Sequence, residues 1–278
     1  MGMELMISPK TAPGCPPALT NFRACRPRGL FLLRHSSPTL TAVLIDAGFF
    51  LKRAARIYGQ RSPEAIARQL HHIALDHLDD SRGRRIARLY RIFVYDAPPA
   101  EWRGHTPISK KFVNFGTSEF AQWKRAFHEH LKSLRKVALR LGHIPATQVQ
   151  WQLTPNALKA LLSRKRDWDS ITDEDFRLDL HQKGVDMRLG MDIGSLTHRR
   201  QVNQIVLISG DSDFVPAAKL ARRGGIDFVV DPMWATIRAD LYEHIDGLRN
   251  VCPKPGHATT DDSTRAAEEQ PPLAAATA

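Results

Sequence analysis

Short apolar runs alternate with segments of helical periodicity along the middle of this sequence. The clearest run is 205–208, whose β-branched residues are typical of a parallel strand buried on both faces. Pro216 suits the first turn of a following helix, and Gly224 and Gly225 suit its end. The same criteria predict strands at 43–45, 91–95, 149–153 and 226–230, and helices at 63–78, 118–141, 156–162, 186–196 and 236–248.

This alternation of strands and helices predicts an α/β domain with a mostly parallel sheet and helices on both faces. The longest predicted helix, 118–141, has apolar residues at steps of three and four, which is the pattern of a core-facing stripe. Another face of that helix is basic. This pattern is typical either of a solvated surface or of a surface that binds nucleic-acid phosphates. The residues are Arg125, His128, Lys132, Arg135, Lys136 and Arg140.

Residues 41–251 are predicted to form the folded domain, because both flanks are rich in proline and lack apolar periodicity. We expect residues 1–40 to be a disordered N-terminal arm, with a transit peptide or an extension before the domain start as alternatives. Residues 252–278 are expected to be a disordered C-terminal tail. No apolar run approaches the roughly 20 residues of a membrane span.

Charge and cysteine content narrow the choice of partners. The net charge is +11, of which 1–40 supplies +4 and 252–278 supplies −2, leaving +9 in 41–251. A basic domain indicates a polyanionic partner, nucleic acid first, although solubility alone is the alternative. Cysteine occurs only in the flanks, which excludes a disulfide framework, a cysteine zinc site and a thiol nucleophile in the domain and suits a reducing cytoplasm.

Aspartates follow the predicted strands. Asp46, Asp96, Asp211 and Asp213 each come after a strand, and Asp186 opens the helix before the strand that precedes Asp211. Parallel strands end at one edge of a sheet, so these carboxylates can approach one another. Two carboxylates about 4 Å apart repel by roughly 4 kcal/mol at an effective dielectric of 20, so such a cluster requires a cation or raised pKa values. Carboxylates without cysteine or suitably spaced histidine suit Mg²⁺ or Mn²⁺, the ions of phosphodiester and phosphoryl transfer.

Each acid also has a purely structural alternative. Asp186 and Asp213 could cap the helices that they precede. The alternative for Asp96 is that it shapes a turn and has no other role. Asp46 ends a buried strand, so some partner must satisfy its carboxylate. Ser209 could orient a carboxylate or a water molecule, or simply form the turn.

Three motifs in combination resemble the NYN domain family, in its LabA-like bacterial branch. They are IDAG at 45–48, KGVD at 183–186 and LISGDSDFVP at 207–216. The resemblance implies a PIN-like three-layer α/β/α sandwich and a metal-dependent ribonuclease that acts on RNA. It further implies that a catalytic Mg²⁺ or Mn²⁺ site is formed by four carboxylates, those of Asp46, Asp186, Asp211 and Asp213. Many members have Asn a few residues after the first Asp, where this chain has Phe49 and Phe50.

Three functions are compatible with these patterns. The first is a metal-dependent endoribonuclease whose basic side chains hold RNA, namely Arg125, Lys132, Arg135, Lys136, Arg199, Arg200, Arg222 and Arg223. The second is a non-catalytic RNA-binding or regulatory adaptor that keeps the fold. The third is a phosphatase of the haloacid-dehalogenase type, which requires a second Asp where this chain has Gly48.

Overall fold

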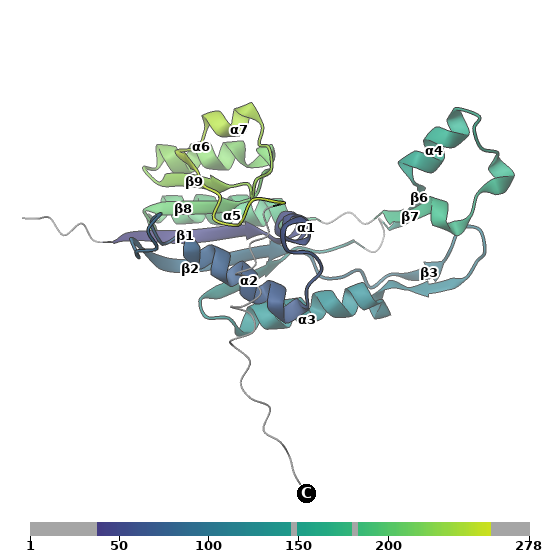
Figure 1. Ribbon diagram of the computed structural model, residues 1–278, viewed down its shortest axis with the longest axis horizontal. Coiled ribbons are helices and arrows are strands. Elements are labelled where there is room, and N and C mark those ends of the chain that lie inside the picture. The colour runs from purple at the N-terminus through teal and green to yellow at the C-terminus, as the bar shows by residue number, and fades with distance from the viewer. Residues whose placement is uncertain (1–37, 146–148, 180–182, 257–278) are drawn as a thin grey trace, which may run out of the picture. The chain divides into compact units, whose positions relative to one another are not determined.

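A six-stranded parallel sheet forms the centre of the described part of the chain, in the order β10-β9-β8-β1-β2-β5 (Figure 1). This computed structural model describes residues 38–145, 149–179 and 183–256, so most of the two predicted disordered flanks lies outside the described residues. The strands are β1 (Thr39–Asp46), β2 (Ala87–Asp96), β5 (Val137–Leu141), β8 (Gln204–Ile208), β9 (Asp227–Asp231) and β10 (Gly247–Leu248).

The helices that follow the strands are α1 (Ala47–Tyr58), α2 (Pro63–Asp76), α3 (Glu119–Ser133), α5 (Val185–His198), α6 (Val215–Arg223) and α7 (Ala239–Glu243). Two small antiparallel sheets lie outside the central one. They pair β3 (Arg103–His105) with β4 (Phe112–Asn114), and β6 (Gln150–Leu153) with β7 (Phe176–Asp179). Helix α4 (Pro155–Leu162) follows β6. Within the described residues, no helix has both the length and the apolar character needed to cross a membrane.

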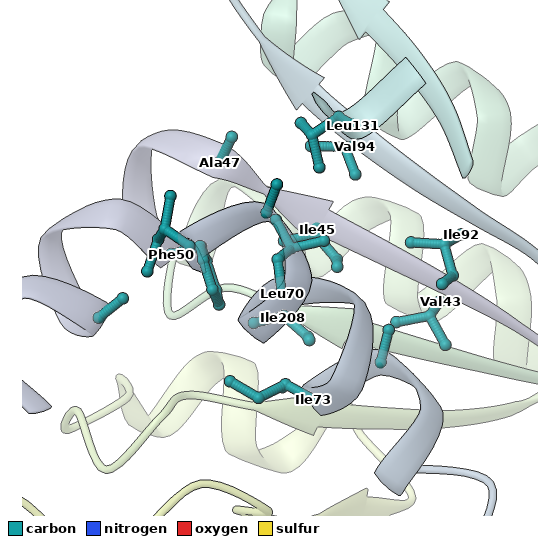
Figure 2. Packing of buried hydrophobic residues seen from close by; sticks show 14 of the residues in the cluster. Val43, Ile45, Ala47, Phe50, Leu70, Ile73, Ile92, Val94, Leu131 and Ile208 are labelled. Carbon is teal, nitrogen blue, oxygen red and sulfur yellow. The ribbon is translucent and has the colours of Figure 1, made fainter. Parts of the chain in front are cut away.

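Alternate side chains of each central strand enter two separate hydrophobic cores. In β1, Val43 and Ile45 pack with residues of α1, α2 and α3, whereas Ala42 and Leu44 pack with residues of α5 and α6. Figure 2 shows the first core, where Ile45 lies together with Phe50 of α1 and other apolar side chains. Because each face of the sheet is covered by its own helices, the predicted three-layer α/β/α sandwich is confirmed.

Side-chain caps fix the starts of two helices. The hydroxyl of Ser62 accepts a hydrogen bond from the backbone N–H of Ala65 in the first turn of α2 (3.2 Å). Thr154 caps α4 in the same way, through the N–H of Ala157 (3.4 Å). Both helices also have proline in their first turn, where a missing N–H costs nothing.

The predicted helix 118–141 is wrong in its second half. Helix α3 ends at Ser133, and the chain then turns through Lys136, at φ 62°, into the edge strand β5. No Gly or Pro marks this end in the sequence, and the apolar spacing of 137–141 suits a strand as well as a helix. Pairing with β2 decides between them. The predicted continuous basic helix face therefore does not exist beyond Ser133.

Three further elements differ from the sequence prediction. The strand predicted at 149–153 exists as β6, but it pairs with β7 instead of joining the central sheet. The helix predicted at 236–248 is only α7, because residues 247–248 pair with β9 as β10. Helix α1, which begins directly after Asp46, was not predicted from the sequence.

The order of the strands reverses next to β1. From β1 the chain builds outward through β2 to β5, and later from β8 through β9 to β10 on the other side. The first half sends its helices to one face and the second half to the other. Ligand sites of open α/β sheets lie outside the carboxyl ends of the strands at such a switch point, which here lies between β1 and β8.

Candidate functional site

Asp46 and the turn after β8 lie together at the switch point. Strands β1 and β8 are parallel neighbours, and Ile45 pairs in register with Ile208. The residues that follow, Asp46 on one strand and Ser209 on the other, therefore leave the sheet side by side. This places the first predicted aspartate next to the turn that carries Asp211 and Asp213.

Asp46 is held by the first turn of α1. It is the N-cap residue of that helix, and its Oδ1 accepts a hydrogen bond from the backbone N–H of Phe49 (3.1 Å). Burial is the largest influence on its pKa and raises it above the ordinary value, and the negative charge of Asp186 raises it further. The hydrogen bond from Phe49 acts in the opposite direction but is outweighed.

Asp186 approaches the same turn from the start of α5. The N-cap of this helix is Gly184, in the left-handed conformation at φ 80°, so Asp186 is not the cap. Burial raises the pKa of Asp186, and the charges of Asp211 and Asp213 raise it further. Asp186 thus links the other three carboxylates. Its charge raises the pKa of Asp46, and its own pKa is raised by the charges of Asp211 and Asp213.

The turn after β8 positions Asp211 through two hydrogen bonds. The fully buried Ser209 accepts from the N–H of Asp211 at its hydroxyl (3.2 Å). The Oδ1 of Asp211 accepts from the N–H of Asp213 (3.0 Å), so Asp211 caps the short 3₁₀ helix η5 (Ser212–Phe214). Asp213 caps neither η5 nor α6. Its carboxylate thus has no structural role in these helix starts.

None of the four carboxylates is neutralised by a basic side chain of the described residues. Among the described residues, no ion pair includes Asp46, Asp186, Asp211 or Asp213. Carboxylate oxygens whose negative charge is not compensated by the protein are the ligands that a hard divalent cation prefers. In the described ranges, however, no group of three or more His, Cys, Asp or Glu side chains stands close enough to hold a metal ion without rearrangement.

Asp96 differs from these four because its charge is compensated. Its carboxylate is 1% exposed and contacts the ammonium of Lys124 (2.9 Å) and the Nε2 of His128 (2.8 Å). Burial by itself raises its pKa, but the hydrogen bond from His128 and the charge of Lys124 prevail and hold the pKa below the ordinary value. Asp96 lies near enough to raise the pKa of Asp46. It is therefore a neighbour of the site whose charge the protein itself satisfies.

The sequence interpretation missed the roles of Lys124 and His128. Both are nearly buried on α3, four residues apart and thus on one helix face. The available signal was a lysine at a core position of the stripe formed by Phe120, Phe127 and Leu131. Its partner, Asp96, is 28 residues away in sequence and could not be recognised from local spacing.

The structure does not bring most of the predicted RNA-binding cations to this edge. Lys132 pairs with Glu129 near the end of α3, and Arg135 and Lys136 precede β5 at the opposite edge of the sheet. Arg199 and Arg200 follow α5, whose 14 residues separate them from Asp186 by about 20 Å. Arg125 lies in the first half of α3 and pairs with Glu101 (3.5 Å). Its guanidinium donates to the Gly116 carbonyl (2.7 Å).

Phe49, one of the two residues at which the family resemblance implies a polar side chain, lies beside the site. Its ring packs against the Asp211 turn, since a Cβ at Gly210 would lie 3.1 Å from the Phe49 Cε2. The ring also contacts the core beneath α1. An apolar side chain thus forms one wall of the site.

Comparison with known families agrees with these observations. Residues 111–235 match the model of the NYN domain, a range that contains Asp186, Asp211 and Asp213 and begins after Asp46. The match confirms the predicted family resemblance, and the NYN domain implies the PIN-like nuclease superfamily.

The other comparisons add little. The crystal structure of a protein of unknown function from Vibrio parahaemolyticus is similar at a TM-score of 0.43 and 12% identity, covering 80% of this chain and 98% of that one. The comparison with curated proteins found no match.

The uncompensated charge of Asp46 leads to a stability prediction. Because its folded-state pKa is raised, ionisation of Asp46 at neutral pH costs folding free energy, and this cost disappears as the pH falls below the ordinary pKa. Asp46→Asn keeps an acceptor for the Phe49 N–H and removes the charge. We expect a higher melting temperature than the wild type at pH 7 in metal-free buffer, and a smaller difference in acid.

Thermal unfolding followed by circular dichroism checks this prediction, with Asp46→Ala as the control. That variant removes the charge and the cap together, so it should be less stable than Asp46→Asn by about 1 kcal/mol. A melting temperature of Asp46→Asn below that of the wild type at pH 7 would show that another group compensates the Asp46 charge.

Proposed function

We propose that this protein is a metal-dependent endoribonuclease that hydrolyses phosphodiester bonds in RNA. The observation that carries the proposal is the convergence of Asp46, Asp186, Asp211 and Asp213 at the switch point of the sheet, without a basic partner among the described residues. The NYN match over 111–235 and the net charge of +9 in residues 41–251 support the same assignment.

The four carboxylates are proposed to hold Mg²⁺ or Mn²⁺. Bound there, a divalent cation supplies charge neutralisation at the scissile phosphate and lowers the pKa of a coordinated water. The protein's own contribution is positional: the first turn of α1 fixes Asp46, and Ser209 fixes the backbone at Asp211. Asp96 is not proposed as a ligand, because Lys124 and His128 already neutralise it. The lack of cysteine in residues 41–251 suits a cytoplasmic setting.

A second candidate function is a non-catalytic RNA-binding adaptor that retains the NYN fold. Two observations favour it: the apolar ring of Phe49 packs against Gly210 beside the carboxylates, and in the described residues no carboxylate group is preformed for a metal. Both candidate functions require the protein to bind RNA, but only the nuclease cleaves it.

An assay of cleavage and binding on the same RNA separates the two. We expect the protein to cleave 5′-labelled single-stranded RNA in Mn²⁺ or Mg²⁺, and to bind the RNA without cleaving it in EDTA. Cleavage that persists in EDTA would point to a contaminating metal-independent ribonuclease. Binding in EDTA without turnover in Mg²⁺, Mn²⁺ or Co²⁺ would contradict the nuclease and support the adaptor.

A further inference from the structure

A cavity of about 350 Å³ lies between α1, the start of α2 and the start of α3. This volume falls in the range of small-molecule sites, which begins near 300 Å³. The lining is mainly apolar but includes charged groups at the rim. Its principal residues are Leu51, Ala55, Arg61, Glu119, Phe120 and Trp123.

Two aromatic side chains form walls of the cavity, and they differ in their contacts and exposure. Trp123 is fixed, because its indole N–H donates to the Arg61 carbonyl (3.1 Å) and its ring stacks on Phe127 (5.5 Å between centroids). Phe120 is 64% exposed, which is unusual for a residue in the apolar stripe of α3. Exposed aromatic faces in a basic protein are platforms on which the bases of single-stranded nucleic acids stack.

The cavity is connected to the carboxylate site by α1. Leu51 lines the cavity and lies in α1, five residues after its N-cap residue Asp46, a rise of about 7.5 Å along the helix axis. From Leu51 the cavity extends past Ala55 to Gly59 at the far end of α1, so it is separate from the carboxylates.

Two unpaired cations lie on α1 beside the cavity. Lys52 and Arg56 are exposed, and they lie one turn apart next to Leu51 and Ala55, which line the cavity. Neither forms an ion pair or a side-chain hydrogen bond with a described residue, and α1 contains no acidic residue. An anionic ligand with a flat apolar part fits this combination of charge and aromatic surface.

We propose that the cavity binds a nucleobase of single-stranded RNA, while Lys52 and Arg56 contact the phosphates that lead from this base to the Asp46 site. The proposal rests on the proposed function, since it specifies the substrate of the same site. The base stacks on Phe120, and the Glu119 carboxylate at the rim accepts hydrogen bonds from amino groups of the base edge. A paired base is excluded because its faces and its edge are already occupied within the duplex.

RNA binding in EDTA tests the base pocket without any catalytic step. Fluorescence anisotropy with a labelled single-stranded RNA and with an abasic ribose-phosphate chain of equal length gives the two dissociation constants. Phe120→Ala should weaken RNA binding by about fivefold to about a hundredfold, the range for removal of one stacked base. Its affinity for the abasic chain should stay unchanged. Ile86→Ala is the control, because Ile86 is also an exposed apolar residue but precedes β2 at the other edge of the sheet.

The phosphate path has its own measurement. The double variant Lys52→Ala/Arg56→Ala should lower the slope of log affinity against log salt by about 1.4, because each phosphate of a single strand that a cation neutralises adds about 0.7 to the slope. The matched control is Arg88→Ala/Arg91→Ala, which removes two exposed cations of β2 and the same net charge. It should change the slope less.

Unchanged RNA binding by Phe120→Ala, or an equal loss for RNA and the abasic chain, would overturn the base pocket. Equal slopes for the two double variants would overturn the path along α1. The base pocket and the nuclease assignment can fail independently of each other. A protein that binds RNA through Phe120 but never cleaves it retains the pocket, whereas a protein that cleaves RNA independently of Phe120 retains only the nuclease.

Discussion

Asp211→Asn is expected to lower the rate of Mn²⁺-dependent RNA cleavage by more than about a hundredfold. Replacing a residue that merely orients a metal ligand costs about 10- to 100-fold, so loss of a ligand charge should cost more. The substitution keeps the Oδ1 that accepts the Asp213 N–H, so the turn should persist. Single-turnover cleavage of a labelled single-stranded RNA measures the effect.

Asp227→Asn is the matched control for this loss of charge. Asp227 is the first residue of β9, at the opposite edge of the sheet from Asp211, and Asn still offers an acceptor to Gln204. Its cleavage rate should stay within about twofold of the wild type if the Asp211 effect is local. Undiminished cleavage by Asp211→Asn, with the control equally active, would refute the assignment of the carboxylate site.

Lys124→Met is expected to destabilise the folded protein by about 3–5 kcal/mol at pH 7. The substitution preserves the apolar stem but leaves the buried Asp96 carboxylate with His128 as its remaining partner, and removing one member of a buried ion pair has costs of this size. Urea unfolding followed by fluorescence gives the difference in unfolding free energy. Because Asp96 lies beside Asp46, the loss would also affect the edge of the sheet that forms the site.

Lys132→Met on the same helix is the control. Its ammonium pairs with Glu129 at the surface, where about half of each side chain or more is exposed, so at most about 1 kcal/mol is expected. Equal stabilities of the two variants would show that the buried ion pair contributes nothing specific.

The Asp96 interaction also predicts a pH dependence with a definite sign. Since the folded-state pKa of Asp96 is below its ordinary value, its contribution is fully present above the ordinary pKa and is lost as the pH falls through the lowered one. The difference between wild type and Lys124→Met should therefore shrink in acid. A constant difference from pH 7 down to acid pH would contradict this account.

The sheet and its site-bearing edge could be predicted because their signals are local. Buried β-branched runs identify β1 and β8, and a residue that follows such a run must lie at the carboxyl edge of a parallel sheet. Asp46 and Asp211 could therefore be placed at the same edge of the sheet without knowledge of the strand order, whereas their proximity follows from the pairing of β1 with β8. For Asp186, the motif resemblance favoured the role of metal ligand over that of helix cap; the hydrophobic periodicity did not distinguish these two roles.

The basic surface could not be predicted because it depends on where α3 ends. Leu134, Ala138 and Leu141 continue the apolar spacing of the helix, yet pairing of β5 with β2 turns the chain into a strand. Arg135 and Lys136 consequently move to the amino edge of the sheet. Local propensity is a weak guide wherever a tertiary pairing competes with it.

The buried cluster around Asp96 was unpredictable for a different reason. Lys124 and His128 are recognisable as polar residues on a core face, but the acid that satisfies them comes from another element. The cavity beside Phe120 likewise requires α1, which the sequence patterns did not reveal. Both features depend on contacts distant in sequence, for which a single chain carries no periodic signal.

The central claim is that the four carboxylates of Asp46, Asp186, Asp211 and Asp213 hold a divalent cation, which Asp46, Asp186 and Asp211 share. Crystals soaked in Mn²⁺ and measured near the manganese absorption edge test it directly, because anomalous difference density locates the ion independently of the protein atoms. We predict one strong peak in contact with all three carboxylates, which would have moved together to bind it. Saturating Mn²⁺ with no peak between Asp46, Asp186 and Asp211 would contradict the metal site and the nuclease assignment that depends on it.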